Sequence, residues 1–331
     1  MNALIINEKT NWRVEKTDIN FFLKETQRSI HTVFNKAEFS ELNKNKVDEI
    51  EYLLIYKKNS PRFAITFGRK KDTLSCPFSA PFGYMELLKG DMTVSDFEEA
   101  EKALEQYFDS IGIRKAMIVF PPSFYDHTVT ETWINVLFNQ GWRAEYIDLN
   151  FGFHIPEVIV DYENKIKYNA RKNLRIAYKA QLGFRKCMTN DEKKEAYEVI
   201  RQNRLGKGYP LKMTLEQVLE AIEVVPSDMY LVTHGEKSIA AALVYEVTQK
   251  AAQVIYWGDI PGYSDKKTIN FLSYELLKVY EQKGFEYLDI GPSTEFGLPN
   301  YGLCDFKDSI GCERTTKIRM SKCFNKGVPE T

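Results

Sequence analysis

The stretch Tyr230–Val247, YLVTHGEKSIAAALVYEV, contains two runs of strand-forming residues on either side of a short turn at 234–237. Such runs around a glycine-containing turn predict an antiparallel β-hairpin. The apolar pattern that follows predicts a strand, a loop, a helix and a further strand. These elements are expected at 252–257, 258–264, 267–282 and 287–290, and the last of them ends at Gly291-Pro292.

The same order of elements occurs in the first half of the chain. Two strands and a turn come first, followed by an irregular stretch, a helix and a strand. Their expected ranges are 52–56, 57–61, 63–67, 76–83, 95–110 and 116–120. A duplicated mixed α/β domain explains this repetition, and the alternative is a coincidence of common α/β elements. We predict an N-terminal domain over 1–155 and a C-terminal domain over 156–331, joined near 151–161.

The composition is that of an ordinary globular protein. Of 331 residues, 44% are hydrophobic and 27% are charged, and the formal net charge is −1, so no overall field draws the chain to DNA or to an anionic membrane. The apolar run at 3–6 is too short for a signal peptide, and the longest run, Ile239–Tyr245, is too short for a membrane span. We therefore expect a cytoplasmic protein of about two domains.

Cysteine and histidine give no sign of a metal site. The five cysteines have no C-x-x-C spacing, and the four histidines are far apart, with no H-x-x-H pair. We expect neither a disulfide framework nor a zinc site, so the cysteines should be reduced thiols and no metal cofactor is predicted.

A basic segment lies between the two halves. From Asn164 to Asn190 the chain has eight basic residues and no acidic one. A helix expected over 162–182 would place four of them on one face, namely Lys167, Arg171, Arg175 and Lys179. Like charges one turn apart destabilise a helix by about 0.2 to 0.5 kcal/mol per pair, so an anion should offset them. Either acidic residues of the fold do so, or Arg171 and Arg175 bind a substrate phosphate or carboxylate.

Three stretches together carry a family resemblance. They are NARKNLRIAYKAQLG at 169–183, LDIGP at 288–292 and GLCDFKDSIG at 302–311. Their order and spacing resemble the Fem-type branch of the GNAT acyltransferase superfamily, which includes the peptidoglycan peptidyltransferases. The resemblance covers Tyr162 to about Met320 and reaches the first half only through the repeat. It implies an α/β fold with mixed sheets in two tandem GNAT-like domains, the first mainly a scaffold, and a reaction site in the second copy or between the copies.

The activity that this resemblance implies is attack of an amine on an activated acyl carbonyl. Such a reaction needs positioning, a donor for the developing oxyanion and a route for the proton. The Phe-Lys pair of the Fem branch matches Phe306 and Lys307, which are therefore candidate catalytic residues. In that role the Lys307 ammonium would hold a substrate phosphate or stabilise the oxyanion. The alternative is that Lys307 is a surface lysine beside Asp305 and Asp308.

Three further residues belong to the expected site. Strand alternation puts Asp289 on the face opposite to Leu288 and Ile290, where it would orient the site, bind substrate or form a structural ion pair. The loop at 291–302 carries Glu295 and Tyr301, which are candidates to relay the proton.

The segment Trp257–Thr268 stands where common GNAT enzymes have the loop that binds the coenzyme A pyrophosphate. That loop has a Q/R-x-x-G-x-G/A pattern before a helix, whereas this segment keeps only scattered glycines. Trp257, Lys266 and Lys267 are the candidate cofactor-binding residues. The first copy has SAPFGY at 79–84 in the matching place, where Pro81 removes a donor, so no cofactor is expected there.

The sequence thus predicts an N-acyltransferase that moves an acyl group, with acyl-CoA as the expected donor, to an amine of a small or phosphorylated acceptor. One alternative is a peptidyltransferase that uses aminoacyl-tRNA to build a cell-wall precursor, which the net charge near zero does not favour. The other alternative is a GNAT-like module that has lost catalysis and only binds a ligand. No DNA partner and no membrane span are expected.

Overall fold

The computed structural model describes residues 11–27, 29, 31–209 and 211–324. The chain divides into two compact units, Met1–Asp148 with Thr316–Thr331, and Leu149–Thr315. These units differ from the predicted domains 1–155 and 156–331, because the last strand returns to the first unit and pairs with a strand there. The N-terminal run that argued against a signal peptide lies outside the described residues. Within the described ranges, no helix has both the length and the apolar character needed to cross a bilayer.

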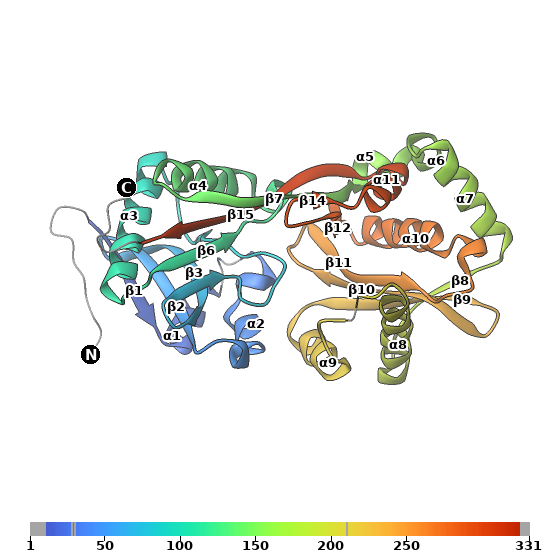
Figure 1. Cartoon of the computed structure of the whole chain (residues 1–331), viewed down its shortest axis with the longest axis horizontal. Helices are drawn as coiled ribbons and strands as arrows, with labels where there is room; N and C mark the ends of the chain where they lie inside the picture. Colours follow the sequence, from blue (N-terminus) through green and yellow to red (C-terminus); the bar gives the residue numbers. More distant parts are fainter. Residues whose placement is uncertain (1–10, 28, 30, 210, 325–331) are drawn as a thin grey trace. The chain divides into compact units, whose positions relative to one another are not determined.

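A mixed sheet with strand order β1-β2-β3-β4-β6-β15 forms the first unit (Figure 1). Its strands are β1 Trp12–Thr17, β2 Glu49–Lys57, β3 Ser60–Lys70, β4 Thr73–Cys76, β6 Lys115–Val119 and β15 Glu313–Cys323, and β5 Glu86–Leu87 pairs with β3. Residues 313–315 at the start of β15 still belong to the second unit. β4 and β6 run parallel, and the other neighbours run antiparallel. The α-helices are α1 Ile19–Thr26, α2 Ala37–Glu41, α3 Val94–Ser110 and α4 His127–Asn139.

In the second unit the strand order is β7-β12-β11-β10-β9-β8. The strands are β7 Arg143–His154, which begins in the first unit, β8 Gly183–Lys186, β9 Ser227–His234, β10 Lys237–Glu246, β11 Ala251–Asp259 and β12 Tyr287–Pro292. The α-helices are α5 Ile155–Val158, α6 Tyr162–Lys165, α7 Tyr168–Lys179, α8 Asn190–Gly206, α9 Leu215–Val224, α10 Thr268–Gln282 and α11 Tyr301–Ser309. Helix α10 lies on one face of this sheet, and α8 and α9 lie on the other (Figure 1). Strands β13 Thr294–Glu295 and β14 Leu298–Pro299 form a separate small hairpin.

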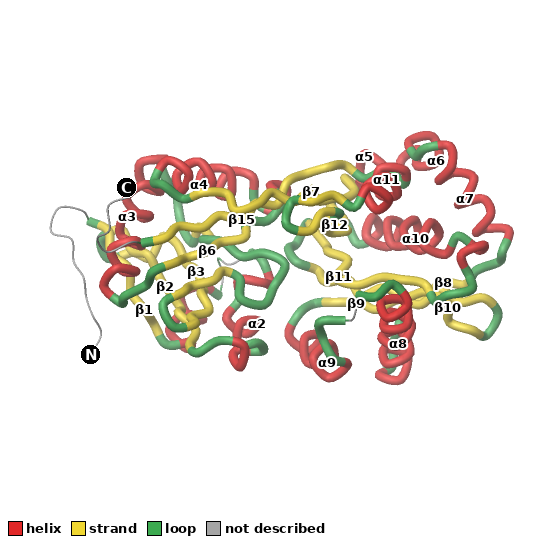
Figure 2. The backbone as a smooth tube through the Cα atoms, viewed as in Figure 1, coloured by secondary structure: helices red, strands yellow, loops and turns green. Residues whose placement is uncertain are grey.

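The two units have the same order of helices and strands, as the sequence predicts. In each, an antiparallel hairpin is followed by a strand, a long helix and a parallel strand. Figure 2 distinguishes the helices, in red, from the strands, in yellow. The parallel pair is β4 and β6 around α3 in the first unit, and β11 and β12 around α10 in the second. Strand β4 is not predicted by the apolar pattern, because it is short and partly polar. The mixed α/β fold class is confirmed.

Aromatic packing forms the centre of the first unit. The ring of Phe63 on β3 lies 4.8 Å from that of Phe97 on α3 and 4.9 Å from that of Trp133 on α4, measured between centroids. Both contacts are edge-to-face, which is a favoured geometry for aromatic rings. Helix α3 begins at a capping box in which Thr93 and Asp96 bond each other's backbone N–H groups. This cap sets the start of the helix that covers the sheet.

Substituting Phe63→Ala tests this core. The side chain is fully buried, so its loss removes the ring contacts and leaves a cavity, and we expect the free energy of unfolding to fall by about 3 to 5 kcal/mol. Urea unfolding measures the change. Phe138→Ala is the matched control, because Phe138 is exposed on α4 of the same unit and its loss should cost much less. Equal losses in the two variants would contradict the assignment of Phe63 to the core.

Candidate active site

The candidate site lies where the parallel ladder of the second unit ends. β11 and β12 pair at Ala251–Tyr287, Ala252–Leu288 and Gln253–Asp289, and the ladder goes no further although β11 continues to Asp259. The ends of parallel strands in open α/β sheets are the usual place for ligands, because the strands leave unpaired backbone there. The side chains at this end of the ladder are therefore the ones to consider first.

Asp289 stands at the end of the ladder with its carboxylate fully buried. Its oxygens accept hydrogen bonds from Asn150 Nδ2 at 2.8 Å, from Gln253 Nε2 at 2.9 Å and from the Gly291 N–H at 2.8 Å. Asn150 belongs to β7 and Gln253 to β11, so three adjacent strands contribute to one polar cluster. The sequence left three roles open for Asp289: an orienting group, a substrate ligand or a member of an ion pair. In the structure, amide donors hold its carboxylate in a fixed orientation.

Lys307 on α11 is buried and only 2% exposed. Its ammonium donates to the carbonyl oxygens of Ile290 at 2.9 Å, Gly291 at 2.8 Å and Pro292 at 3.1 Å. The alternative of a surface lysine beside Asp305 and Asp308 is therefore wrong. α11 turns Lys307 inward toward the end of β12, while Asp308 accepts from Arg314 Nε at 2.9 Å.

The three carbonyls explain an irregularity in β12. Carbonyls of consecutive residues in a regular strand alternate in direction, whereas those of Ile290, Gly291 and Pro292 all reach Lys307. The register between β12 and β7 shifts between Asp289 and Pro292, and Gly291 has a φ of +75°, which glycine adopts without strain. Lys307 thus stabilises a bulge at the end of β12, and bulges commonly re-aim the chain beside active sites.

Burial lowers the pKa of Lys307 to about 8, because a charged ammonium loses hydration inside the protein. The nearby Cys312, Asp289 and Cys304 oppose this shift, and the positive charge of Arg204 adds to it. All three N–H donors of the ammonium already have carbonyl partners, so a direct bond to a substrate phosphate would have to replace one of them. With all three donors occupied, the ammonium offers a bound group its charge rather than a hydrogen bond.

An aromatic pair joins β11 to α11. Trp257 on β11 and Phe306 on α11 lie edge to face, with ring centroids 6.5 Å apart, and both are half-buried. The structure therefore brings together a residue predicted to bind cofactor and one predicted to act in acyl transfer. Arg204 of α8 lies over the ring of Tyr256 at 5.7 Å, and its buried Nε has no hydrogen-bond partner among the described residues.

Glu295 and Tyr301 lie at the surface of the connection between β12 and α11. Glu295 pairs with Leu298 in the small hairpin, whose two turn residues, Phe296 and Gly297, have φ values of +52° and +79°. Positive φ at both turn positions is typical of a type I′ hairpin, although it is uncommon for a bulky residue. Tyr301 opens α11 and is 75% exposed. The structure does not join either side chain to Lys307 by a hydrogen bond.

The basic segment forms two helices rather than the single one expected over 162–182. Ile166 and Lys167 are extended, with ψ values of 154° and 152°, so α6 ends at Lys165 and α7 begins at Tyr168. Arg175 donates to Glu163 at 2.9 Å, so at this position an acidic residue of the fold offsets the charge. Arg171 is half-buried, and its buried Nε has no hydrogen-bond partner among the described residues. Arg171 therefore remains the better candidate of the two for a substrate anion.

The start of α10 does not suit a pyrophosphate. Thr268, the first residue of the helix, donates from Oγ1 to the Asp259 carboxylate at 2.7 Å, so a negative charge already lies beside the positive end of the helix dipole. Lys266 is paired with Asp265 at 3.1 Å, and Lys267 takes a left-handed conformation with a φ of +56°. A second anion would meet repulsion from Asp259, so these residues do not fit the predicted coenzyme A pyrophosphate site.

The two units differ at corresponding places. The parallel ladder of the first unit ends at Cys76–Ile118, two buried apolar side chains, whereas that of the second ends at Gln253–Asp289. Polar groups that could act on a substrate are therefore present at this position in the second unit and absent from the corresponding residue pair of the first.

Known structures share this architecture. FemX is 12% identical to this chain, with 95% of this chain and 98% of that chain covered and a TM-score of 0.67. The C-terminal domain of a putative lysylphosphatidylglycerol synthetase from Agrobacterium fabrum is 12% identical, with 92% of each chain covered and a TM-score of 0.61. The chain has a Fem-type, tandem GNAT-like fold. A tandem GNAT protein from the clavulanic acid biosynthesis pathway is 7% identical, with 96% and 100% covered and a TM-score of 0.50. No protein-family model and no curated protein matches the sequence.

Sequence reasoning missed Asn150, Gln253 and Arg204. Asn150 and Gln253 are single amides inside otherwise apolar strands, and a lone polar residue in such a run is a weak sign of a buried polar contact. Arg204 belongs to a helix with many charged residues, where no pattern separates it from its neighbours. The bonds of Asn150 and Gln253 to Asp289, and the effect of the Arg204 charge on the pKa of Lys307, become visible only in the folded chain.

Replacing Lys307 by Met tests the effect of burying this charge. The pKa of Lys307 is lowered from 10.5 to about 8, so between these pH values the unfolded chain binds more protons than the folded chain. The stability of the natural chain should therefore rise relative to that of Lys307→Met as the pH increases from 8 to 10.5, by roughly 3 kcal/mol at most. Urea unfolding of both proteins across this pH range measures the difference. A difference that does not change with pH would contradict the lowered pKa.

Proposed function

We propose that this protein is an acyltransferase that moves an acyl group from an activated ester or thioester to an amine. The observation that supports it best is the buried cluster of Asp289, Gln253, Asn150 and Lys307 at the end of the β11–β12 ladder. This cluster combines a fixed carboxylate with a fixed positive charge in a fold that acyltransferases use. Fold alone does not determine an activity, so the proposal rests on the cluster as well.

The proposed reaction forms a C–N bond and breaks a C–O or C–S bond. The amine attacks the acyl carbonyl carbon, negative charge develops on the carbonyl oxygen, the alcohol or thiol leaves, and the amine gives up a proton. Lys307 supplies a fixed positive charge that favours the developing oxyanion in a region from which water is excluded. Trp257 and Phe306 form the apolar wall against which the acyl group packs. Glu295 and Tyr301 remain the proposed route for the proton.

Two donor classes follow from the family resemblance. Acyl-CoA is the donor expected from the sequence, but the Asp259 carboxylate beside Thr268 does not favour a pyrophosphate at the start of α10. This observation favours the second candidate, an aminoacyl ester carried by tRNA, because such a donor need not place a pyrophosphate there. An inactive module that only binds a ligand is the remaining alternative.

We propose an acceptor amine that also carries a phosphate or carboxylate. Arg171 is one candidate for its recognition. We also propose a cytoplasmic site of action, where thiols such as those of the five cysteines stay reduced.

An acyl-transfer assay tests the proposal. The full chain is incubated with acyl-CoA or with aminoacyl-tRNA and a panel of anionic amines, and mass spectrometry detects an acceptor that gains an acyl group. Lys307→Met should reduce kcat by about 100-fold or more, since it removes the positive charge fixed near the developing oxyanion. Arg175→Gln is the control and should change the rate little, because Arg175 is paired with Glu163.

Three results would separate the alternatives. Activity only with aminoacyl-tRNA would select the peptidyltransferase-type donor over acyl-CoA. Absence of any acyl product, with an anionic amine still bound, would favour the inactive module. Full activity of folded Lys307→Met on an identified substrate would exclude the proposed role of Lys307. Circular dichroism of each variant establishes that it is folded before its rate is interpreted.

A further inference from the structure

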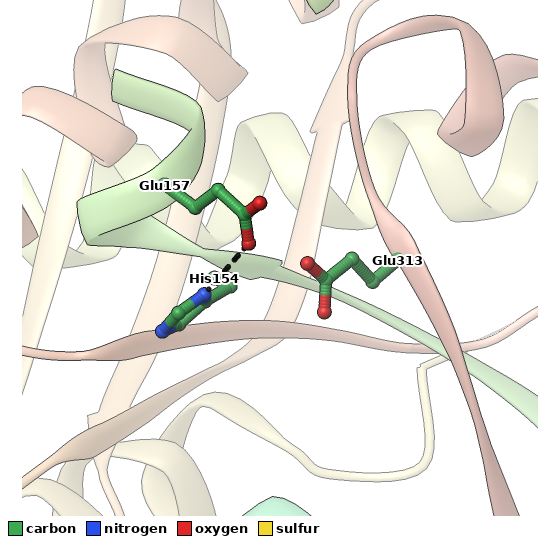
Figure 3. A group of neighbouring side chains, drawn as sticks. All are labelled: His154, Glu157 and Glu313. Atoms are coloured by element: carbon green, nitrogen blue, oxygen red, sulfur yellow. Dashed lines mark hydrogen bonds and ion pairs between the residues drawn. The ribbon is translucent and has the colours of Figure 1, made fainter. Parts of the chain in front are cut away.

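Three side chains with metal-binding atoms meet in the second unit, apart from the cluster around Asp289. They are His154, Glu157 and Glu313, and one ligand atom from each lies within 4.8 Å of the other two (Figure 3). His154 Nδ1 is 3.2 Å from Glu157 Oε2. In Figure 3 the Glu313 carboxylate is turned toward these two groups from a different segment of the chain.

The backbone holds these residues in place. His154 is the last residue of β7, and Glu157 lies one helical turn further on in α5. The His154 ring stacks on Tyr287, its partner across the strands, with centroids 5.0 Å apart and planes 24° apart. Glu313 opens β15 and follows a turn in which the Cys312 N–H donates to the Lys307 carbonyl at 3.2 Å. The imidazole is thus oriented before any ligand arrives, which lowers the cost of binding one.

The cluster has an uncompensated negative charge. Among the described residues, Glu313 has no hydrogen bond and no ion pair, and the carboxylate of Glu157 bonds only His154. The cations nearest in the chain are engaged elsewhere, because Arg314 pairs with Asp308, and Lys165 bonds the backbone carbonyl of Glu157. Lys250 is likewise paired with Glu286, at 2.7 Å. Two carboxylates and one imidazole therefore face each other without a fixed positive charge between them.

We propose that His154, Glu157 and Glu313 bind a divalent transition-metal ion of the zinc class. An imidazole nitrogen with two carboxylate oxygens is a donor set that suits Zn²⁺, whereas Mg²⁺ and Ca²⁺ prefer oxygen ligands only. With bonds of about 2.0 to 2.2 Å, ligand atoms around tetrahedral zinc lie about 3.3 Å apart. The 3.2 Å between His154 and Glu157 already matches this spacing, and rotation of the exposed Glu313 side chain brings the third oxygen closer.

This metal ion has a structural consequence that is independent of the proposed acyl transfer. It links the end of β7 and the start of α5 to the first residue of β15, which are far apart in the sequence. Because it binds the folded chain and finds no assembled site in the unfolded chain, it stabilises the fold, and the stabilisation grows with the logarithm of the zinc concentration divided by the dissociation constant. With three protein ligands, one coordination position remains for water or another small ligand.

Titration of the metal-free full chain with ZnCl₂ tests the site. Isothermal titration calorimetry should show one zinc ion bound per chain, and the unfolding temperature should rise with zinc. His154→Ala and Glu313→Gln should each weaken binding by about tenfold or more and remove the shift in unfolding temperature. Glu220→Gln is the matched control, since Glu220 is exposed on α9 of the same unit and should leave zinc binding unchanged.

Cobalt spectroscopy distinguishes this site from the free cysteines. Co²⁺ bound to nitrogen and oxygen gives visible ligand-field absorption, and Co²⁺ bound to thiolate adds an intense charge-transfer band. We expect the ligand-field absorption without the thiolate band, and its loss in His154→Ala. A thiolate band that His154→Ala leaves intact would overturn the proposal, as would zinc affinity that is equal in the natural chain and in Glu313→Gln. Absence of zinc binding to the natural chain would overturn it as well.

Discussion

The candidate site depends on one interaction, in which the Lys307 ammonium donates hydrogen bonds to three consecutive backbone carbonyls. Burying an ammonium costs several kcal/mol unless hydrogen bonds replace its hydration, and here three charge-assisted bonds do so. To supply these bonds, β12 must leave regular strand geometry, which requires the positive φ of Gly291. The same bulge turns the Gly291 N–H onto Asp289. One buried charge therefore joins helix α11, the end of β12 and the fixed carboxylate.

The two units share one topology and differ in the side chains at corresponding places. In each unit a long helix connects two parallel strands and packs its buried hydrophobic residues on the sheet. At the end of the ladder, the first unit places Cys76 and Ile118, and the second places Gln253 and Asp289. An apolar pair adds to the core, whereas a polar pair needs donors from neighbouring strands and a nearby counter-charge. The second unit has both, in Asn150 and Lys307.

Sequence patterns predicted much of the fold and part of the site. Hairpins, long helices and parallel strands follow from local periodicity, which explains why α3 and α10 lie close to their expected ranges. Local patterns were less informative where polar residues dominate. Strand β4 was missed, and the basic helix was expected to be continuous although Ile166 and Lys167 are extended. The family motif singled out Lys307, but a lysine between two aspartates reads locally as exposed.

The sequence by itself determined the duplicated α/β architecture, the absence of a strong net charge and the candidate pair Phe306 and Lys307, because periodicity, composition and motif are local properties. Tertiary structure alone decided that Lys307 is buried against β12, that Asn150 and Gln253 hold Asp289, and that Glu313 faces His154 and Glu157. Asn150 and Asp289, like His154 and Glu313, are more than a hundred positions apart, and Gln253 meets Asp289 across neighbouring strands. Lys307 reaches β12 through the packing of helix α11. Pairing of strands and packing of helices bring such residues together, and that placement depends on the whole fold.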